Sequence, residues 1–166
     1  RQEYGNTPIL VTYGKKVNYW TTFNEPNVFI NEGYYAGYFP PGKKDARTAG
    51  IVLGNILKAH VKTYKMAKQL NYNNDLKVGI VMSIFLFEPS NKINLIDWIG
   101  TYLADDAFNK TILRFLKTGT YRYLVLPYGQ PIKFLDENAT KSIDFIGVNY
   151  YSCLLYTSPS PRDWTI

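Results

Sequence analysis

Residues 77–82 read Lys-Val-Gly-Ile-Val-Met, a short run that is apolar almost throughout. A strand with one face in water alternates apolar and polar residues, whereas an uninterrupted apolar run is typical of a strand buried on both faces. Strands of that kind occur in parallel sheets that helices cover. This run therefore directs the chain towards an α/β fold.

Two amphipathic segments flank the apolar run. Residues 46–70 predict a long helix, because their apolar positions recur at spacings of three and four and form one stripe. His60 falls on that stripe, so we expect a core histidine hydrogen-bonded to a neighbour, with a catalytic role as the alternative. A second helix is predicted from about residue 101 to residue 117, where apolar residues again share one face.

Two further strands are predicted, one on either side of these elements. Residues 9–23 read as a short linker followed by a strand rich in β-branched and aromatic residues, and Pro26 ends that strand at the polar pair Asn24 and Glu25. Residues 31–45 carry glycines and prolines and are expected to form an irregular loop. Residues 143–151, IDFIGVNYY, form a third apolar strand that ends in polar residues.

The order strand, loop, helix, strand, helix, strand is the repeating unit of an α/β fold with parallel strands. A (β/α)8 TIM barrel needs eight strands and typically ~250 residues. We therefore expect an incomplete barrel, an internal piece of a longer protein, over residues 1–152. Residues 153–166 break the pattern, and CLLYTSPSPRD resembles the translation of a sequencing adapter, so we expect a non-native tail there.

Composition excludes few functions. The formal net charge is +6, but the lysines are dispersed without a basic, aromatic-rich stripe, so we expect a solvated surface and no nucleic-acid partner. No apolar run reaches the ~18 residues of a membrane-spanning helix. One histidine and one cysteine, Cys153, cannot build a metal centre, so neither a metal nor a cofactor is expected. The absence of cysteine before residue 153 favours the cytosol over secretion.

Glu25 is the leading catalytic candidate. Hydrolysis of a glycosidic bond uses two carboxyl groups that face each other across the sugar. Glu25 lies at the carboxyl end of a predicted parallel strand, where barrels place catalytic groups, beside an amide, Asn24, that can bind a sugar hydroxyl. A surface or capping carboxylate is the alternative for Glu25. Solvated or capping roles are expected for the remaining carboxylates considered, Glu32, Glu88, Asp105, Asp106 and Glu137.

Two long motifs resemble those of glycoside hydrolase family 1. VNYWTTFNEPN, residues 17–27, resembles the family's acid/base signature, whose core is TFNEP, and DFIGVNYYS, residues 144–152, resembles its sixth-strand segment. GYFPPG at residues 37–42 and NILKAHVKTY at residues 55–64 also fit, in the same order. The resemblance covers residues 1–152 and implies that the chain holds about strands 4 to 6 of the barrel.

The resemblance implies a role for each of four residues. Glu25 would be the general acid/base of a retaining double displacement, and Asn24 would hold the hydroxyl next to the anomeric carbon. Tyr151 would donate its phenol to the nucleophile carboxylate. Asn149 would lie in the polar shell near the acid/base, or equally be a strand-end amide that satisfies backbone groups. A glutamate at position 25, where the family's thioglucosidases carry glutamine, favours a β-O-glycosidase of the β-glucosidase type acting on small glycosides or oligosaccharides.

Several family features are missing. The nucleophile segment (I/V)TENG does not occur in the sequence, so we expect the chain alone to be inactive. Residues 115–140 lack the usual WFxDP and GDYP elements, which leaves substrate preference open, the 6-phospho-glycosidase branch included. A non-catalytic sugar-binding or structural relative is the alternative. The triplets 109–111 and 138–140 fit the N-glycosylation pattern and matter only in a secreted protein.

Overall fold

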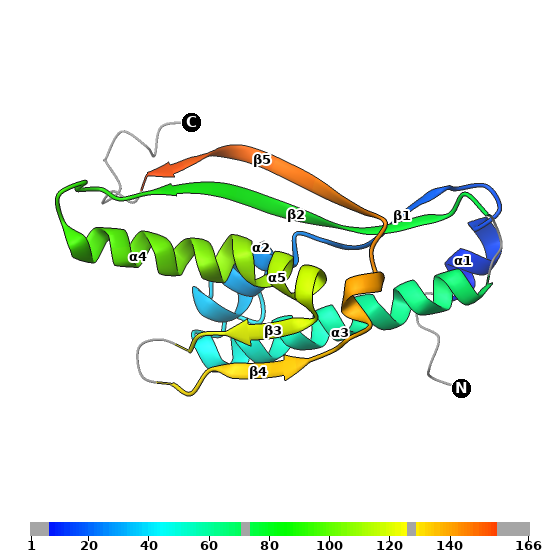
Figure 1. The fold of residues 1–166 in the computed structure, drawn as a ribbon, viewed down its shortest axis with the longest axis horizontal. Helices are drawn as coiled ribbons and strands as arrows, with labels where there is room; N and C mark the ends of the chain where they lie inside the picture. Colours follow the sequence, from blue (N-terminus) through cyan, green and yellow to red (C-terminus); the bar gives the residue numbers. More distant parts are fainter. Residues whose placement is uncertain (1–6, 71–73, 126–128, 156–166) are drawn as a thin grey trace.

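The computed structural model describes residues 7–70, 74–125 and 129–155, with the backbone alone at residues 7, 8, 11 and 151–155 (Figure 1). Its helical elements are α1 (Thr7–Tyr13), α2 (Pro26–Ile30), the π-helix η1 (Asn31–Tyr35), α3 (Ala46–Leu70), α4 (Leu95–Asp105), the π-helix η2 (Asp106–Lys110), α5 (Thr111–Thr118) and the 3₁₀-helix η3 (Ala139–Lys141). Its strands are β1 (Tyr19–Asn24), β2 (Lys77–Glu88), β3 (Thr120–Tyr123), β4 (Ile132–Leu135) and β5 (Phe145–Leu155).

The main sheet contains the three predicted strands, in the order β1-β2-β5, and both pairings are parallel. Tyr19 lies opposite Lys77, and Gly79 opposite Phe145. The parallel α/β prediction is confirmed, and the three strands do not close a barrel. β2 runs six residues beyond the predicted end at Met82, and β5 continues to Leu155. The remainder of the expected tail, residues 156–166, lies outside the described residues.

The core lies between β2 and the helices on one side of the sheet (Figure 1). Helix α3 has the predicted bounds, and its stripe packs on β2 as the spacing indicates. The fully buried members of this core include Leu53, Leu57, Ile80, Met82, Ile112 and Phe115. Among the described helices, none is both long and apolar enough to cross a membrane.

Three local predictions are wrong. The expected linker from residue 9 contains helix α1, because Leu10 is buried against Ala67, Leu76 and Val78 and this packing overrides the weak helix preference of β-branched residues. The expected loop at 31–45 begins with the π-helix η1, which continues α2.

The second helix begins earlier than residue 101. The side chain of Asn94 accepts a hydrogen bond from the Ile96 amide at 2.9 Å, so the helix starts at Leu95, and it continues through η2 and α5 to Thr118. Apolar residues all around its first turns hide the 3.6-residue period that marked the rest.

The segment that departs from the family pattern contains an antiparallel hairpin, β3–β4, that pairs Thr120 with Leu135 and Tyr123 with Ile132. The hairpin packs on α3 at Gly50 and Gly54, where missing side chains allow a close approach. The Tyr121 hydroxyl donates to the Gly50 carbonyl at 2.5 Å. A Cβ built at Gly50 would lie 2.5 Å from Tyr123, so any larger residue must displace the hairpin.

The space around a glycine decides how the fold responds when alanine replaces it, and Gly50 and Gly100 differ in this respect. Gly50→Ala should destabilise the fold by a net amount of up to ~2 kcal/mol, because overpacking costs ~1–3 kcal/mol and the gain in helix propensity is only ~1 kcal/mol. Gly100→Ala, where a Cβ meets nothing within 4 Å, should stabilise the fold by up to ~1 kcal/mol. Urea unfolding of both variants measures these changes, and a stabilising Gly50→Ala would show that the hairpin is not seated on α3.

Candidate active site

The chain leaves the sheet at Glu25. β1 ends at Asn24, and Glu25 adopts φ 49° and ψ 52°, the left-handed conformation, as the only non-glycine residue with positive φ in the described ranges. For an L-residue this costs ~1–2 kcal/mol, and such strain occurs preferentially at functional sites. Pro26 begins α2 directly afterwards. The predicted end of the strand at this polar pair is confirmed.

Two backbone hydrogen bonds hold the strained residue. The Glu25 amide donates to the Val81 carbonyl of β2 at 2.8 Å, which continues the β1–β2 ladder. The Glu25 carbonyl accepts from the Phe29 amide at 3.0 Å, which is the first bond of the helical turn. Glu25 therefore links β1 to α2: its amide extends the ladder of the sheet, and its carbonyl accepts the first hydrogen bond of the helix.

The structure brings three of the predicted site residues together. Asn149 donates its side-chain amide to Glu25 Oε1 at 2.7 Å and, more weakly, to Asn24 Oδ1 at 3.4 Å. β1 and β5 are not neighbours, so this side chain reaches across β2, near Val81 and Ser83. Glu25 is half-buried and Asn24 exposed. Tyr151 belongs to β5, but its side chain lies outside the described residues, so its role stays a prediction.

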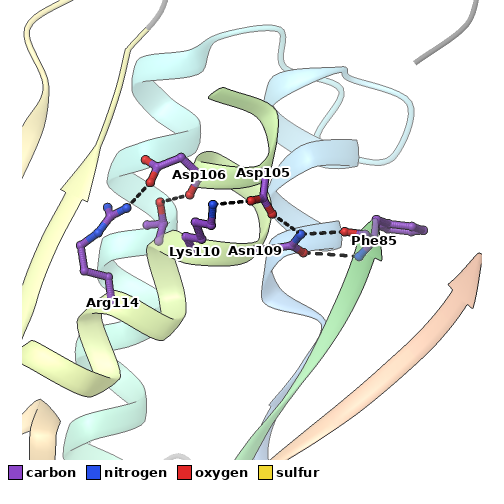
Figure 2. A network of polar contacts seen from close by, with 7 residues as sticks. Phe85, Asp105, Asp106, Asn109, Lys110 and Arg114 are labelled. Carbon is purple, nitrogen blue, oxygen red and sulfur yellow. Dashed lines mark hydrogen bonds and ion pairs between the residues drawn. The ribbon is translucent and has the colours of Figure 1, made fainter. Parts of the chain in front are cut away.

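The carboxylates Asp105 and Asp106 are engaged in a structural network (Figure 2). Asp105 pairs with Lys110 at 2.5 Å and accepts from Asn109 at 2.7 Å, and Asp106 pairs with Arg114. Asn109 in turn donates to the Phe85 carbonyl at 2.7 Å and accepts from the Phe85 amide at 3.4 Å (Figure 2). Asp106 is therefore buried in an ion pair, which differs from the solvated or capping role expected for it, and the contacts also occupy the amide of the first N-glycosylation triplet.

His60 is fully buried in α3, as the stripe predicts. Its Nδ1 lies 2.7 Å from the Thr22 hydroxyl, which also contacts the Gly79 carbonyl at 3.2 Å. Both contacts are satisfied when Nδ1 carries the proton and Thr22 donates to Gly79. Nε2 then has no partner, and burial lowers the pKa of His60 to about 4, against a smaller opposing effect of the Ser142 backbone. His60 is thus a neutral core residue.

A cavity in the described part of the chain lies away from the candidate site. It measures about 650 Å³ and lies among α2, η1, α4, η2 and the end of β2, where Phe85, Phe87, Leu103 and Phe108 line it. Asn24, Glu25 and Asn149 are not among its lining residues. A carboxylate at the carboxyl edge of a parallel sheet, beside amides that can bind hydroxyl groups, is the arrangement with recognisable chemistry here.

Sequence reasoning missed Asn27 and Asn109. The Asn27 side chain is 4% exposed and donates to the Ser83 carbonyl at 2.6 Å and to the Phe108 carbonyl at 3.3 Å. Each is an isolated asparagine, and nothing in the sequence around it indicates a structural role of this kind. The sole sequence signal was their place in recognised patterns, Asn27 at the end of VNYWTTFNEPN and Asn109 in the first N-glycosylation triplet.

Comparison with known sequences gives one family. The profile described as "Glycosyl hydrolase family 1" matches residues 2–164. The chain is 32% identical over 153 residues to the 1,4-beta-D-glucan glucohydrolase of Thermotoga neapolitana, covering 87% of the chain and 35% of that relative. It is also 32% identical over 152 residues to the 6-phospho-beta-galactosidase of Staphylococcus haemolyticus, covering 82% and 32%. The chain spans about a third of the length of these curated relatives.

Comparison with solved structures agrees. The beta-glycosidase from Pyrococcus horikoshii superimposes with a TM-score of 0.72 at 31% identity, over 88% of this chain and 31% of that one. The likeness therefore extends over nearly all the elements described above.

Proposed function

The chain belongs to glycosyl hydrolase family 1, and we propose from this membership that it forms the middle part of an enzyme that hydrolyses terminal β-O-glycosidic bonds, of the β-glucosidase type. The observation that carries the proposal is the contact of Asn149 with Glu25 across the sheet edge. It supports the proposal because a carboxylate and two amides lie together where β1 ends, and barrel enzymes bind their substrates at the carboxyl ends of strands.

In the proposed mechanism, Glu25 acts twice. Protonated, it gives its proton to the glycosidic oxygen as the aglycone departs, while a second carboxylate attacks the anomeric carbon and forms a covalent glycosyl-enzyme. Ionised, it then removes a proton from the water that cleaves this ester, so the β configuration is retained. The Asn149 amide donates to Oε1 at 2.7 Å and so orients the carboxyl group for both steps.

The neighbouring polar groups would bind the sugar. Asn24 is exposed beside Glu25 and can donate to the hydroxyl next to the anomeric carbon, a bond that strengthens in the transition state. Tyr151, two residues beyond Asn149 on the same strand, would donate its phenol to the nucleophile. The sequence contains no (I/V)TENG segment, so the nucleophile would come from another part of the enzyme.

Hydrolysis assays on the full-length protein and on the 166-residue chain test the proposal. The full-length protein should release aglycone from aryl β-glucosides, and NMR should show the β anomer first, whereas the chain alone should give no turnover. Aryl 6-phospho-β-galactosides serve as the second substrate, because a 6-phospho-beta-galactosidase is equally similar. A folded full-length protein that binds glucosides without hydrolysing them would instead support the non-catalytic sugar-binding alternative.

A further inference from the structure

The strand β2 is longer than its neighbour β1, and its free edge is finished by side chains. On that edge the Val81 carbonyl accepts from the Glu25 amide, which is the last backbone bond of the β1–β2 ladder. In a parallel ladder the acceptors on one edge recur every second residue, so the next one is the Ser83 carbonyl. Its backbone partner would be the amide of residue 27, but the chain has already turned into α2.

The side-chain amide of Asn27 takes the place of that backbone bond. Asn27 Nδ2 donates to the Ser83 carbonyl at 2.6 Å, and Asn109 then pairs with both backbone groups of Phe85, the next residue on the same edge (Figure 2). Asn27 also donates to the Phe108 carbonyl at 3.3 Å, which joins the two amides through η2. The side chains of Asn27 and Asn109 therefore supply hydrogen bonds to the edge of β2 beyond the point where β1 stops pairing with it.

This arrangement bears on Glu25 because Asn27 is the polar anchor of the turn that follows it, beside the buried Pro26 and Ile30. α2 has five residues and is too short to be stable by itself, so tertiary anchors must set its direction. Asn27 lies in its first turn and is 4% exposed. The left-handed Glu25 must be held against a conformational preference for other φ values, and the bonds on either side of it, at Val81 and at Ser83, do so.

We propose that Asn27 is a positioning residue for Glu25, which substitutes for a missing ladder bond and so keeps the Glu25 carboxylate against Asn149. The inference rests on the proposed acid/base role of Glu25. Asn27 itself touches no reacting atom. Its Oδ1 has no hydrogen-bond partner, so the donated bonds alone orient the amide.

Asn27→Asp in the full-length protein tests this with almost no change of shape. The new carboxylate faces two carbonyl oxygens, so α2 must shift. We expect kcat/KM for a poor-leaving-group glucoside to fall about 100-fold, the loss typical of a ~1 Å misplacement, while KM changes little. The pH profile of kcat/KM should also differ from wild type, because it reports the essential acid and base, and a displaced Glu25 no longer meets Asn149 in the same way.

Three controls separate the outcomes. A dinitrophenyl glucoside needs no proton to depart, so near-wild-type kcat/KM on this substrate shows that Asn27→Asp is folded. If Asn27→Asp does not fold, Asn27→Ser, which also removes the amide donor, takes its place. Asn55→Asp makes the same change on an exposed position of α3 and should resemble wild type. If Glu25→Gln lowers kcat/KM but a folded Asn27 variant matches Asn55→Asp in rate and pH profile, positioning by Asn27 is refuted. If Glu25→Gln has no effect, the proposed function fails instead.

Discussion

Replacing Glu25 by glutamine in the full-length protein is expected to lower kcat/KM for alkyl glucosides by about 10²–10⁴-fold, the range that general acid catalysis supplies. Glutamine is close in size and can keep a hydrogen bond with Asn149, but it has no proton of suitable acidity for a departing alkoxide. For a dinitrophenyl glucoside, whose leaving group is stable as an anion, kcat/KM should stay within a few-fold of wild type. Steady-state rates on a leaving-group series measure this difference.

The second half of the mechanism gives an independent signature of the same variant. Without a base at position 25, water attacks the glycosyl-enzyme slowly, so kcat on the activated substrate should fall. A burst of dinitrophenol should then precede the slow steady-state phase. Azide, which needs no base, should restore turnover and yield a glycosyl azide of retained configuration. Glu137→Gln, an exposed carboxylate beside η3, is the matched control. Equal losses on good and poor leaving groups would contradict the acid/base role.

Lowering the pH from 7 to 4 is expected to remove about 3 kcal/mol of folding free energy through His60 alone. The pKa is about 4 in the fold and near 6.5 in an unfolded chain, so between these values the unfolded state binds a proton that the native state does not. Stability is therefore highest above pH 6.5 and falls as the pH drops towards 4. The cause is burial, which the Ser142 backbone offsets only in part.

Urea unfolding between pH 7 and 5 isolates this effect, because His60 is the only histidine in the chain and most carboxylates titrate at lower pH. His60→Gln stays neutral and can keep a hydrogen bond with Thr22, so its unfolding free energy should vary much less over this interval. A wild-type protein as flat as this variant would mean that His60 is already charged, or already solvated, in the fold.

The sequence predicted well those elements whose own residues show a clear local pattern, whatever they pack against. Helix α3 shows its period over 25 residues, and the run at Lys77 is apolar enough to require burial wherever it packs. The hairpin β3–β4 was missed, because an alternation over only four residues is too short to distinguish a strand from a loop. Its stability depends on Gly50 and Gly54, which lie 66 or more positions away in the sequence. Long-range packing of this kind has no local signature.

The candidate site divides in the same way. Glu25 and Asn24 could be predicted because a motif and a proline mark the strand end, and Asn149 because a second motif does. The contact between Asn149 and Glu25 could not, since it depends on the register that sets Asn149 opposite Ser83 of β2. Asn27 and Asn109 matter only because β1 is shorter than β2, which no single segment reveals.

The position of the hairpin has an evolutionary consequence. β3 and β4 pack on α5 and α3, on the helical side of the molecule, while Glu25 and Asn149 meet at the end of the parallel strands. Changes in residues 115–140 therefore affect first the packing of the hairpin on α3 at Gly50 and Gly54, and not the strands that carry the carboxylate. Exchanges at the exposed positions of this segment should therefore leave the site unchanged, whereas its buried residues, Phe115 and Tyr121 among them, are constrained by the core.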